Sequence, residues 1–149
     1  MARRAVERTR MGIMAETNAP AARPLSPHLQ IYRPMLTMTM SIVHRITGIA
    51  NYAGMALFTW WLLAAASGPN GYARFEWFAG SIIGRLILFG YTWSVIHHML
   101  GGVRHLIWDV GRGFGPVERE WLAAANLIGS IALTVLLWII GLLAMGGAR

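Results

Sequence analysis

The sequence predicts an all-α membrane protein with three transmembrane helices, at about residues 37–66, 79–109 and 121–146. Of its 149 residues, 56% are hydrophobic and only 13% are charged, whereas soluble domains carry about 25% charged residues. Three long segments contain no charged residue, namely 46–73, 86–103 and 121–148. Each can supply the roughly 20 residues that a helix needs to cross a bilayer. None shows the polar face of a soluble helical bundle, so lipid is expected to surround most of the chain.

The first 35 residues differ from the rest. They contain six arginines and four prolines and show little periodicity, so we expect an extended cytoplasmic segment over 1–35 and a three-helix anchor domain over 36–149. An apolar core near the start, which a secretory signal peptide requires, is missing. Glu7 and Glu16 argue against a mitochondrial transit peptide. The predicted location is therefore the bacterial inner membrane, with the mitochondrial inner membrane as the alternative.

The arginines predict the orientation and exclude some functions. Six precede the first span and two more, Arg112 and Arg119, lie in the 110–120 loop, so the positive-inside rule places the N-terminus and that loop in the cytoplasm. The arginines gather outside the apolar runs, which does not fit a nucleic-acid-binding protein. The chain has no cysteine, which excludes disulfides and a cysteine-held iron–sulfur cluster on it. Residues 67–78 are interpreted as a polar turn with aromatic anchors.

The first polar cluster is "SIVHRITG", residues 41–48. On a helix, spacings of three and four residues share a face, so Ser41, His44, Arg45 and Gly48 are expected to form one stripe near the cytoplasmic end of the first span. Ser41 can exchange a hydrogen bond and Arg45 supplies a fixed cation with planar donors, so the stripe could bind a carbonyl headgroup or carboxylates. The alternative is that Arg45 only reaches towards lipid phosphate, with His44 as a bridging residue.

The second polar cluster lies in "SVIHHMLGGVRHLIWDVG", residues 94–111, where ionisable groups at membrane depth indicate function. It contains two helical registers, His98–Gly102–His105 and His97–Gly101–Arg104. Neutral imidazole is a good axial ligand for haem iron, and a glycine one turn away would let a flat macrocycle or another helix approach. Spacing does not choose between the two registers, and it is also compatible with packing histidines or a proton relay.

The depths of the histidines bear on a second iron ligand. His44 lies near the cytoplasmic end of its span, whereas His97 and His98 lie about two turns further in. We therefore expect His44 to be poorly matched in depth with either of them, and a second axial ligand to come from another chain.

Taken together, "RPLSPHLQIYRPMLTMTMSIVHRITGIA" and "HHMLGGVRHLIWDVG" resemble the cytochrome b556 subunit of succinate dehydrogenase, the large membrane-anchor subunit of respiratory complex II. The resemblance covers residues 23–112 by motif, and the three-span layout extends it to the C-terminus. The motifs are S-x-x-H-R-x-[ST]-G in the first helix and H-x-x-x-G-x-R-H-x-x-x-D in the second. Both are present in order, which makes the pair specific.

The resemblance implies roles for individual residues. His98 matches the axial ligand of haem b, because a glycine follows it after four residues and a histidine after seven, and Gly102, Arg104 and His105 complete that motif. The second axial histidine would belong to the small anchor subunit. Ser41 and Arg45 match the family's ubiquinone-binding residues, and the His44–Arg45 pair matches residues that reach the haem propionates. His97 is left without a role.

The resemblance also implies an activity for the assembled complex. A flavoprotein subunit would oxidise succinate, and an iron–sulfur subunit would pass the electrons to ubiquinone at this anchor, so this chain alone would not oxidise succinate. The alternatives are an anchor of a quinol:fumarate reductase, a structural anchor without haem, and a small proton-conducting membrane protein.

Overall fold

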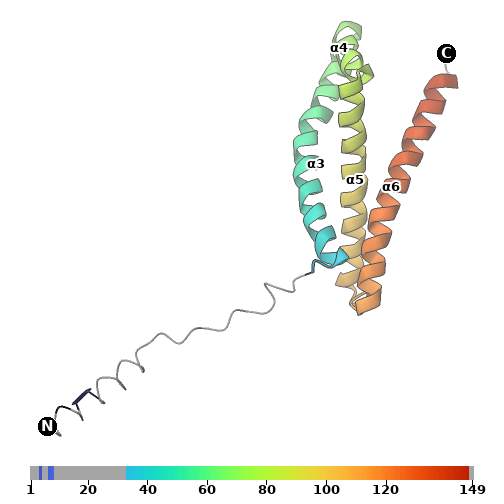
Figure 1. Cartoon of the computed structure of the whole chain (residues 1–149). Coiled ribbons are helices and arrows are strands. Elements are labelled where there is room, and N and C mark those ends of the chain that lie inside the picture. The colour runs from blue at the N-terminus through green and yellow to red at the C-terminus, as the bar shows by residue number, and fades with distance from the viewer. Residues whose placement is uncertain (1–3, 5–6, 9–32, 148–149) are drawn as a thin grey trace. The chain divides into compact units, whose positions relative to one another are not determined.

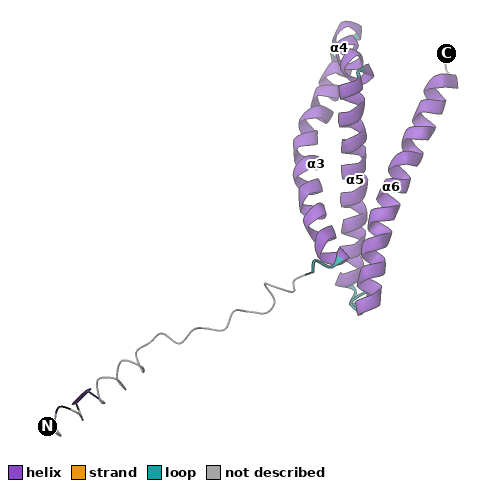
Figure 2. Ribbon diagram, in the orientation of Figure 1, coloured by secondary structure: helices purple, strands orange, loops and turns teal. Residues whose placement is uncertain are grey.

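The computed structural model describes residues 4, 7–8 and 33–147. Residues 36–147 contain four helices, namely α3 (Leu36–Ala66), α4 (Pro69–Gly80), α5 (Ile82–Asp109) and α6 (Pro116–Gly147) (Figure 1). The described residues contain no strand (Figure 2). Helices α3, α5 and α6 are long and apolar enough to cross a membrane, which confirms the predicted all-α protein with three spans. The expectations for residues 1–32 fall outside the described residues, except at Arg4, Glu7 and Arg8, which are helical.

Helix α5 is the centre of the bundle. It packs against α3 on one side and against α6 on the other, while α3 and α6 also touch each other. Figure 1 shows α6 leaning away from α5 towards its C-terminal end. The residues of α5 that face α3 and those that face α6 therefore belong to two different interfaces.

The segment between the first two spans is a helix, which corrects the predicted polar turn over 67–78. Gly68 has a φ of 81° and turns the chain, and Pro69 then starts α4 at a position where its missing N–H costs nothing. Phe75 is buried, with its ring centroid 5.2 Å from that of Trp60 on α3. The aromatic residues thus pack a short helix back against the bundle instead of only anchoring a turn.

Two span boundaries also differ from the prediction. The second span begins at Ile82 instead of 79, because the Ser81 hydroxyl caps a new helix by accepting from the Gly84 amide at 3.0 Å. The third begins at Pro116 instead of 121, with Glu118 in its first turn. Proline at a helix start and a carboxylate near the positive end of the helix dipole both favour the earlier beginning.

The side chains buried within the bundle are mainly polar. Among the described residues, the buried polar side chains are Thr47, Ser94, His97, Arg104, Asn126, Ser130 and Thr134, and the buried apolar ones are Met40, Ala64, Phe75, Ile96 and Ala123. Large apolar side chains instead cover the outer surface of the long helices. Lipid is as apolar as leucine, so small and polar side chains supply the contacts that hold membrane helices together. The bundle follows that rule.

Candidate functional site

His98 lies between α3 and α5 with one ring nitrogen engaged. Its Nδ1 is 3.0 Å from the carbonyl oxygen of His44 and 3.4 Å from Thr47 Oγ1. A carbonyl only accepts, so Nδ1 carries the proton and donates it, which leaves the lone pair on Nε2 free. Nε2 makes no hydrogen bond within residues 33–147. A hydrogen bond from the other ring nitrogen is how proteins fix a metal-binding histidine.

Gly48 of α3 lies directly beside the His98 ring. A Cβ atom built on Gly48 would be 3.1 Å from His98 Cε1 and 4.0 Å from Nε2. That spacing is tighter than an ordinary van der Waals contact. The absence of a side chain at residue 48 therefore lets α3 pack closely against the imidazole, a contact that the sequence pattern did not show.

His44 stacks on His98, which corrects the predicted mismatch in depth. The two ring centroids are 4.0 Å apart and the ring planes are within 3° of parallel. The prediction measured depth from the charged ends of the apolar runs. Helix α3 already begins at Leu36 and α5 runs on to Asp109, so both histidines lie well inside their helices. Gly101 permits the approach, because a Cβ there would overlap the His44 ring.

The stacking of His44 on His98 excludes one role for the pair of rings. Two parallel rings 4.0 Å apart are already in van der Waals contact, which leaves no room for a flat macrocycle between them. His44 and His98 therefore do not ligate one iron from opposite faces. The His105 ring completes the group, with its centroid 5.4 Å from that of His44.

His97 points to the other side of α5. Its side chain is 0% exposed, and Nδ1 is 3.1 Å from the Ser130 hydroxyl on α6. The indole N–H of Trp93 donates to the same hydroxyl at 3.2 Å. Consecutive residues of a helix are rotated by about 100°, so the adjacent histidines face different helices. His97 joins α5 to α6.

The predicted stripe on α3 divides into two rows. Ser41 and Arg45 are exposed on the outside of the bundle, whereas His44 and Gly48 are half-buried against α5. Residues four apart are rotated by only about 40°, and the mean directions of the two pairs differ by about 60°. The expectation of a single face is thus wrong: one row contacts α5 and the other is open to whatever surrounds the chain.

The remaining predicted residues are not all in one place. Arg104 is 2% exposed and its guanidinium carbon is 5.0 Å from the centre of the Trp108 ring, a cation–π distance. It lies on the same face of α5 as His97, seven residues away, and not with His98. His105 is exposed at the rim. A Cβ on Gly102 would meet nothing within 4 Å, so Gly102 leaves an open surface.

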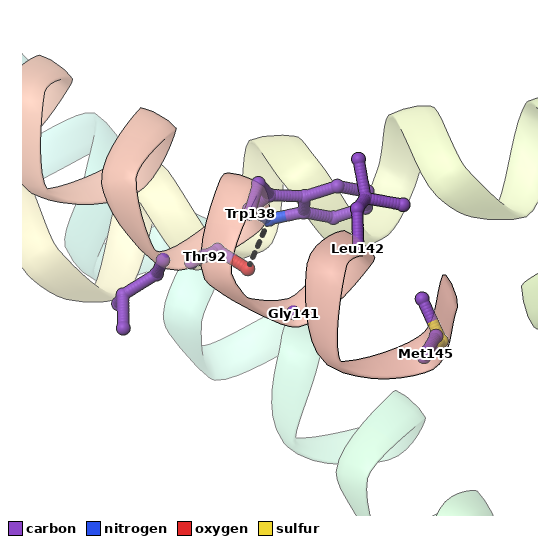
Figure 3. Close-up of a pocket in the computed structure, with 6 residues that line it drawn as sticks. Thr92, Trp138, Gly141, Leu142 and Met145 are labelled. Carbon is purple, nitrogen blue, oxygen red and sulfur yellow. Dashed lines mark hydrogen bonds between the residues drawn. The ribbon is translucent and has the colours of Figure 1, made fainter. Parts of the chain in front are cut away.

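A hollow lies between α5 and the C-terminal half of α6 (Figure 3). It has a volume of about 300 Å³ and is lined by Thr92, Leu137, Trp138, Gly141, Leu142 and Met145. Its hydrogen bond runs from the Trp138 indole N–H to the Thr92 hydroxyl at 3.3 Å. No histidine or charged side chain lines it, so it offers no group for redox or proton chemistry.

Comparison with known proteins gives a consistent result. The family described as "Succinate dehydrogenase/Fumarate reductase transmembrane subunit" matches residues 19–141. The succinate dehydrogenase cytochrome b556 subunit of Paracoccus denitrificans is 43% identical over 127 residues, which are 85% of this chain and 97% of that protein. The b556 subunit of Rickettsia prowazekii is 37% identical, over 78% of this chain and 91% of its own. The mitochondrial b560 subunit of Mus musculus is 34% identical, over 74% and 66%. The chain belongs to the family of succinate dehydrogenase and fumarate reductase transmembrane subunits.

Proposed function

We propose that this chain is the haem b-binding membrane anchor of a succinate:ubiquinone oxidoreductase, and that His98 is its iron ligand. The observation that carries the proposal is the orientation of His98. Its Nδ1 proton is committed to the His44 carbonyl, its Nε2 lone pair is free, and Gly48 lets α3 lie close against the ring. The names of the relatives as cytochrome b subunits support the same cofactor.

The residues present fit a haem that is shared with another chain. His98 offers one imidazole, and His44 is excluded as the opposite ligand by its stacking on His98. We therefore assign the second axial ligand to the small membrane-anchor subunit. When bound, haem b supplies a one-electron carrier within the membrane. Gly102 presents an open surface on the same helix face as His98 and His105, which would let the macrocycle approach.

The polar residues beside His98 would orient the haem propionates. The rings of His44 and His105 lie beside each other where α3 meets α5. Arg45 follows His44 on the exposed row of α3. Arg104 is buried behind them, so it contributes positive charge from inside the bundle. A cation in a low-dielectric site stabilises a nearby carboxylate more strongly than it does in water.

Ser41 and Arg45 would form this chain's part of the ubiquinone site. Both are exposed and lie one helical turn apart on α3, so the Ser41 hydroxyl can donate to a quinone carbonyl while Arg45 faces the same oxygen. Negative charge develops on that oxygen during reduction, and a preorganised cation lowers the barrier by stabilising it. The flavoprotein and iron–sulfur subunits would deliver the electrons from succinate.

Direction of turnover separates this proposal from a quinol:fumarate reductase anchor, since the matched family includes both. The relatives named above are succinate dehydrogenase subunits, which favours succinate oxidation. The rates of succinate oxidation and fumarate reduction, measured on the purified complex with its own quinone, would decide.

The iron ligand is tested with the reduced-minus-oxidised absorption spectrum of the purified membrane complex. The wild-type complex should show a b-type band, and His98→Ala should lose it together with bound haem. His97→Ala is the matched control, because the neighbouring residue faces α6, and it should keep the band. An unchanged band in His98→Ala, or a lost band only in His97→Ala, would contradict the assignment. The absence of a haem band from the wild-type complex would favour a purely structural anchor.

A further inference from the structure

We propose that Thr47 is a positioning residue for His98. Its hydroxyl oxygen and the His44 carbonyl oxygen together accept a three-centre hydrogen bond from His98 Nδ1–H, and Thr47 thereby adjusts how strongly the ring donates electrons through Nε2. Since it concerns an iron bound at Nε2, this role rests on the proposed function and adds to it a residue that sets the reduction potential.

The Thr47 hydroxyl lies within reach of two acceptors and one donor. Its Oγ1 is 3.0 Å from the Val43 carbonyl oxygen, 2.9 Å from the His44 carbonyl oxygen and 3.4 Å from His98 Nδ1. His98 Nδ1 is in turn 3.0 Å from the same His44 oxygen. The Thr47 side chain is 2% exposed, so its hydrogen bonds are made inside the bundle.

The number of lone pairs on each carbonyl decides which one takes the hydroxyl proton. A carbonyl oxygen has two lone pairs. At His44, the regular α-helix uses one for the Gly48 amide, and His98 Nδ1–H uses the other. At Val43, the helix uses only one, so the Thr47 hydroxyl donates there. The hydroxyl oxygen then keeps a lone pair for His98 Nδ1–H, and three-centre bonds of this kind are common in proteins.

Contacts from α5 hold Thr47 in this position. The Ser94 hydroxyl is 3.0 Å from the Thr47 carbonyl oxygen and 2.8 Å from Asn51 Oδ1, and Ser94 is buried. Ser94 precedes His98 by one helical turn, so one face of α5 carries both the ring and the hydroxyl that fixes α3 beside it. The second acceptor is therefore preorganised for His98.

A second acceptor on Nδ1–H makes the imidazole a stronger electron donor. Hydrogen bonds from the other ring nitrogen raise the basicity of a ligating histidine, and such bonds are one means by which proteins adjust haem potentials. A more basic ligand stabilises the ferric state and lowers the midpoint potential. The contact at 3.4 Å is weaker than the one at 3.0 Å. The His44 carbonyl thus fixes the ring, and Thr47 adjusts its electron density.

Optical redox titration of the purified complex tests this role. Thr47→Val removes the hydroxyl but keeps the shape of the side chain, and it should raise the haem midpoint potential. Thr47→Ser keeps the hydroxyl and should stay near the wild-type value, which a purely structural role for the threonine methyl group does not predict. If the valine variant assembles without haem, Thr47→Ala replaces it, with the same rise expected.

Thr59→Val is the matched control on the same helix. The Thr59 hydroxyl also bonds a carbonyl of its own helix, that of Met55 at 2.8 Å, but it lies about 18 Å from Thr47 along α3. Its loss should leave the midpoint potential unchanged. An unchanged or lowered potential in the hydroxyl-free variant at residue 47, or an equal rise in Thr47→Ser, would overturn the proposal.

Failure of the proposed function would give a different result. If His98→Ala keeps the haem band, His98 is not the iron ligand, and the potential does not report on its hydrogen bond. The three-centre bond is then measured directly by solid-state NMR of the reduced complex with isotope-labelled histidine. Removal of the Thr47 hydroxyl should move the His98 Nδ1–H proton signal upfield, because a weaker hydrogen bond leaves the proton more shielded. A signal that does not move would refute the bond itself.

Discussion

The two faces of α5 perform different tasks, although their key residues are neighbours in the sequence. Towards α3, His98 bonds a backbone carbonyl and keeps one ring nitrogen free, and glycine lies beside it. Towards α6, His97 is fully enclosed and shares the Ser130 hydroxyl with Trp93. His98 is fixed through one ring nitrogen and its other nitrogen makes no bond to a described residue, whereas His97 is fully buried between α5 and α6.

The comparison shows that residue type does not decide the role of an intramembrane histidine. What decides it is which nitrogen is engaged and what lies opposite the other one. A histidine that acts as a ligand needs one nitrogen fixed and the other accessible. His98 meets both conditions, and His97 meets only the first.

Among substitutions on the α3 side, Arg45→Ala is expected to have the largest effect, which is on quinone-reductase turnover. Under the proposed function Arg45 faces the quinone oxygen, so its loss should lower quinone-reductase turnover by roughly 10²-fold, as with other preorganised electrostatic groups. Because Arg45 is exposed and packs little, assembly and Tm should stay near the wild-type values. Steady-state assays with a soluble quinone would measure the loss, and succinate oxidation by an artificial acceptor that bypasses the membrane subunits is the control. Equal loss in both assays would refute the role.

Gly101→Ala should disturb the contact between α3 and α5. A Cβ at 101 would overlap the His44 ring, and overpacking of this kind costs about 1–3 kcal/mol. Thermal unfolding of the purified complex should show a Tm lowered by several degrees. Gly102→Ala is the matched variant, since its Cβ meets nothing within 4 Å in this chain, so it should leave Tm unchanged and disturb only the haem spectrum. A stable Gly101→Ala complex would contradict the described approach of α3 to α5.

The smallest effect is expected on the α6 side, from Ser130→Ala. The change removes the acceptor of two hydrogen bonds, from Trp93 and from His97, and each such bond between membrane helices is worth about 0.6–2 kcal/mol. Tm should fall slightly while the haem band and quinone-reductase rate stay unchanged. A spectral shift as large as that of a His98 variant would mean that the two faces are not independent.

Much of the fold could be predicted because long uncharged runs are a direct consequence of the bilayer. The spans were found, but α4 was not, because its aromatic residues pack on Trp60 only after α3 has formed. The site was predicted in part. Spacing identified His44, His98 and His105 as candidates, and the structure brings these three together. The spacing along the sequence did not predict that Thr47 and Gly48 are neighbours of His98, because that contact depends on how α3 and α5 align.

Arg104 and His97 show the limit of arguing from one helix. Both belong to the polar motif of α5, but the sequence of α5 alone does not show which residues of other helices they contact. Burial between α5 and α6 depends on the register of α6, where Asn126 and Ser130 give no strong signal of their own. The choice of His98 over His97 rested on the family motif, and the orientation of the two rings now supplies a physical reason for the same choice.

The most direct test of these separate roles is exchange of each histidine for methionine, followed by optical redox titration of the purified complex. Methionine can still ligate haem iron, and replacement of an axial histidine by methionine raises the reduction potential. His98→Met should therefore shift the reduced band and raise the haem midpoint potential, a change that simple unfolding does not produce. His97→Met should leave both at the wild-type values. A raised potential in His97→Met with an unchanged His98→Met would contradict the account.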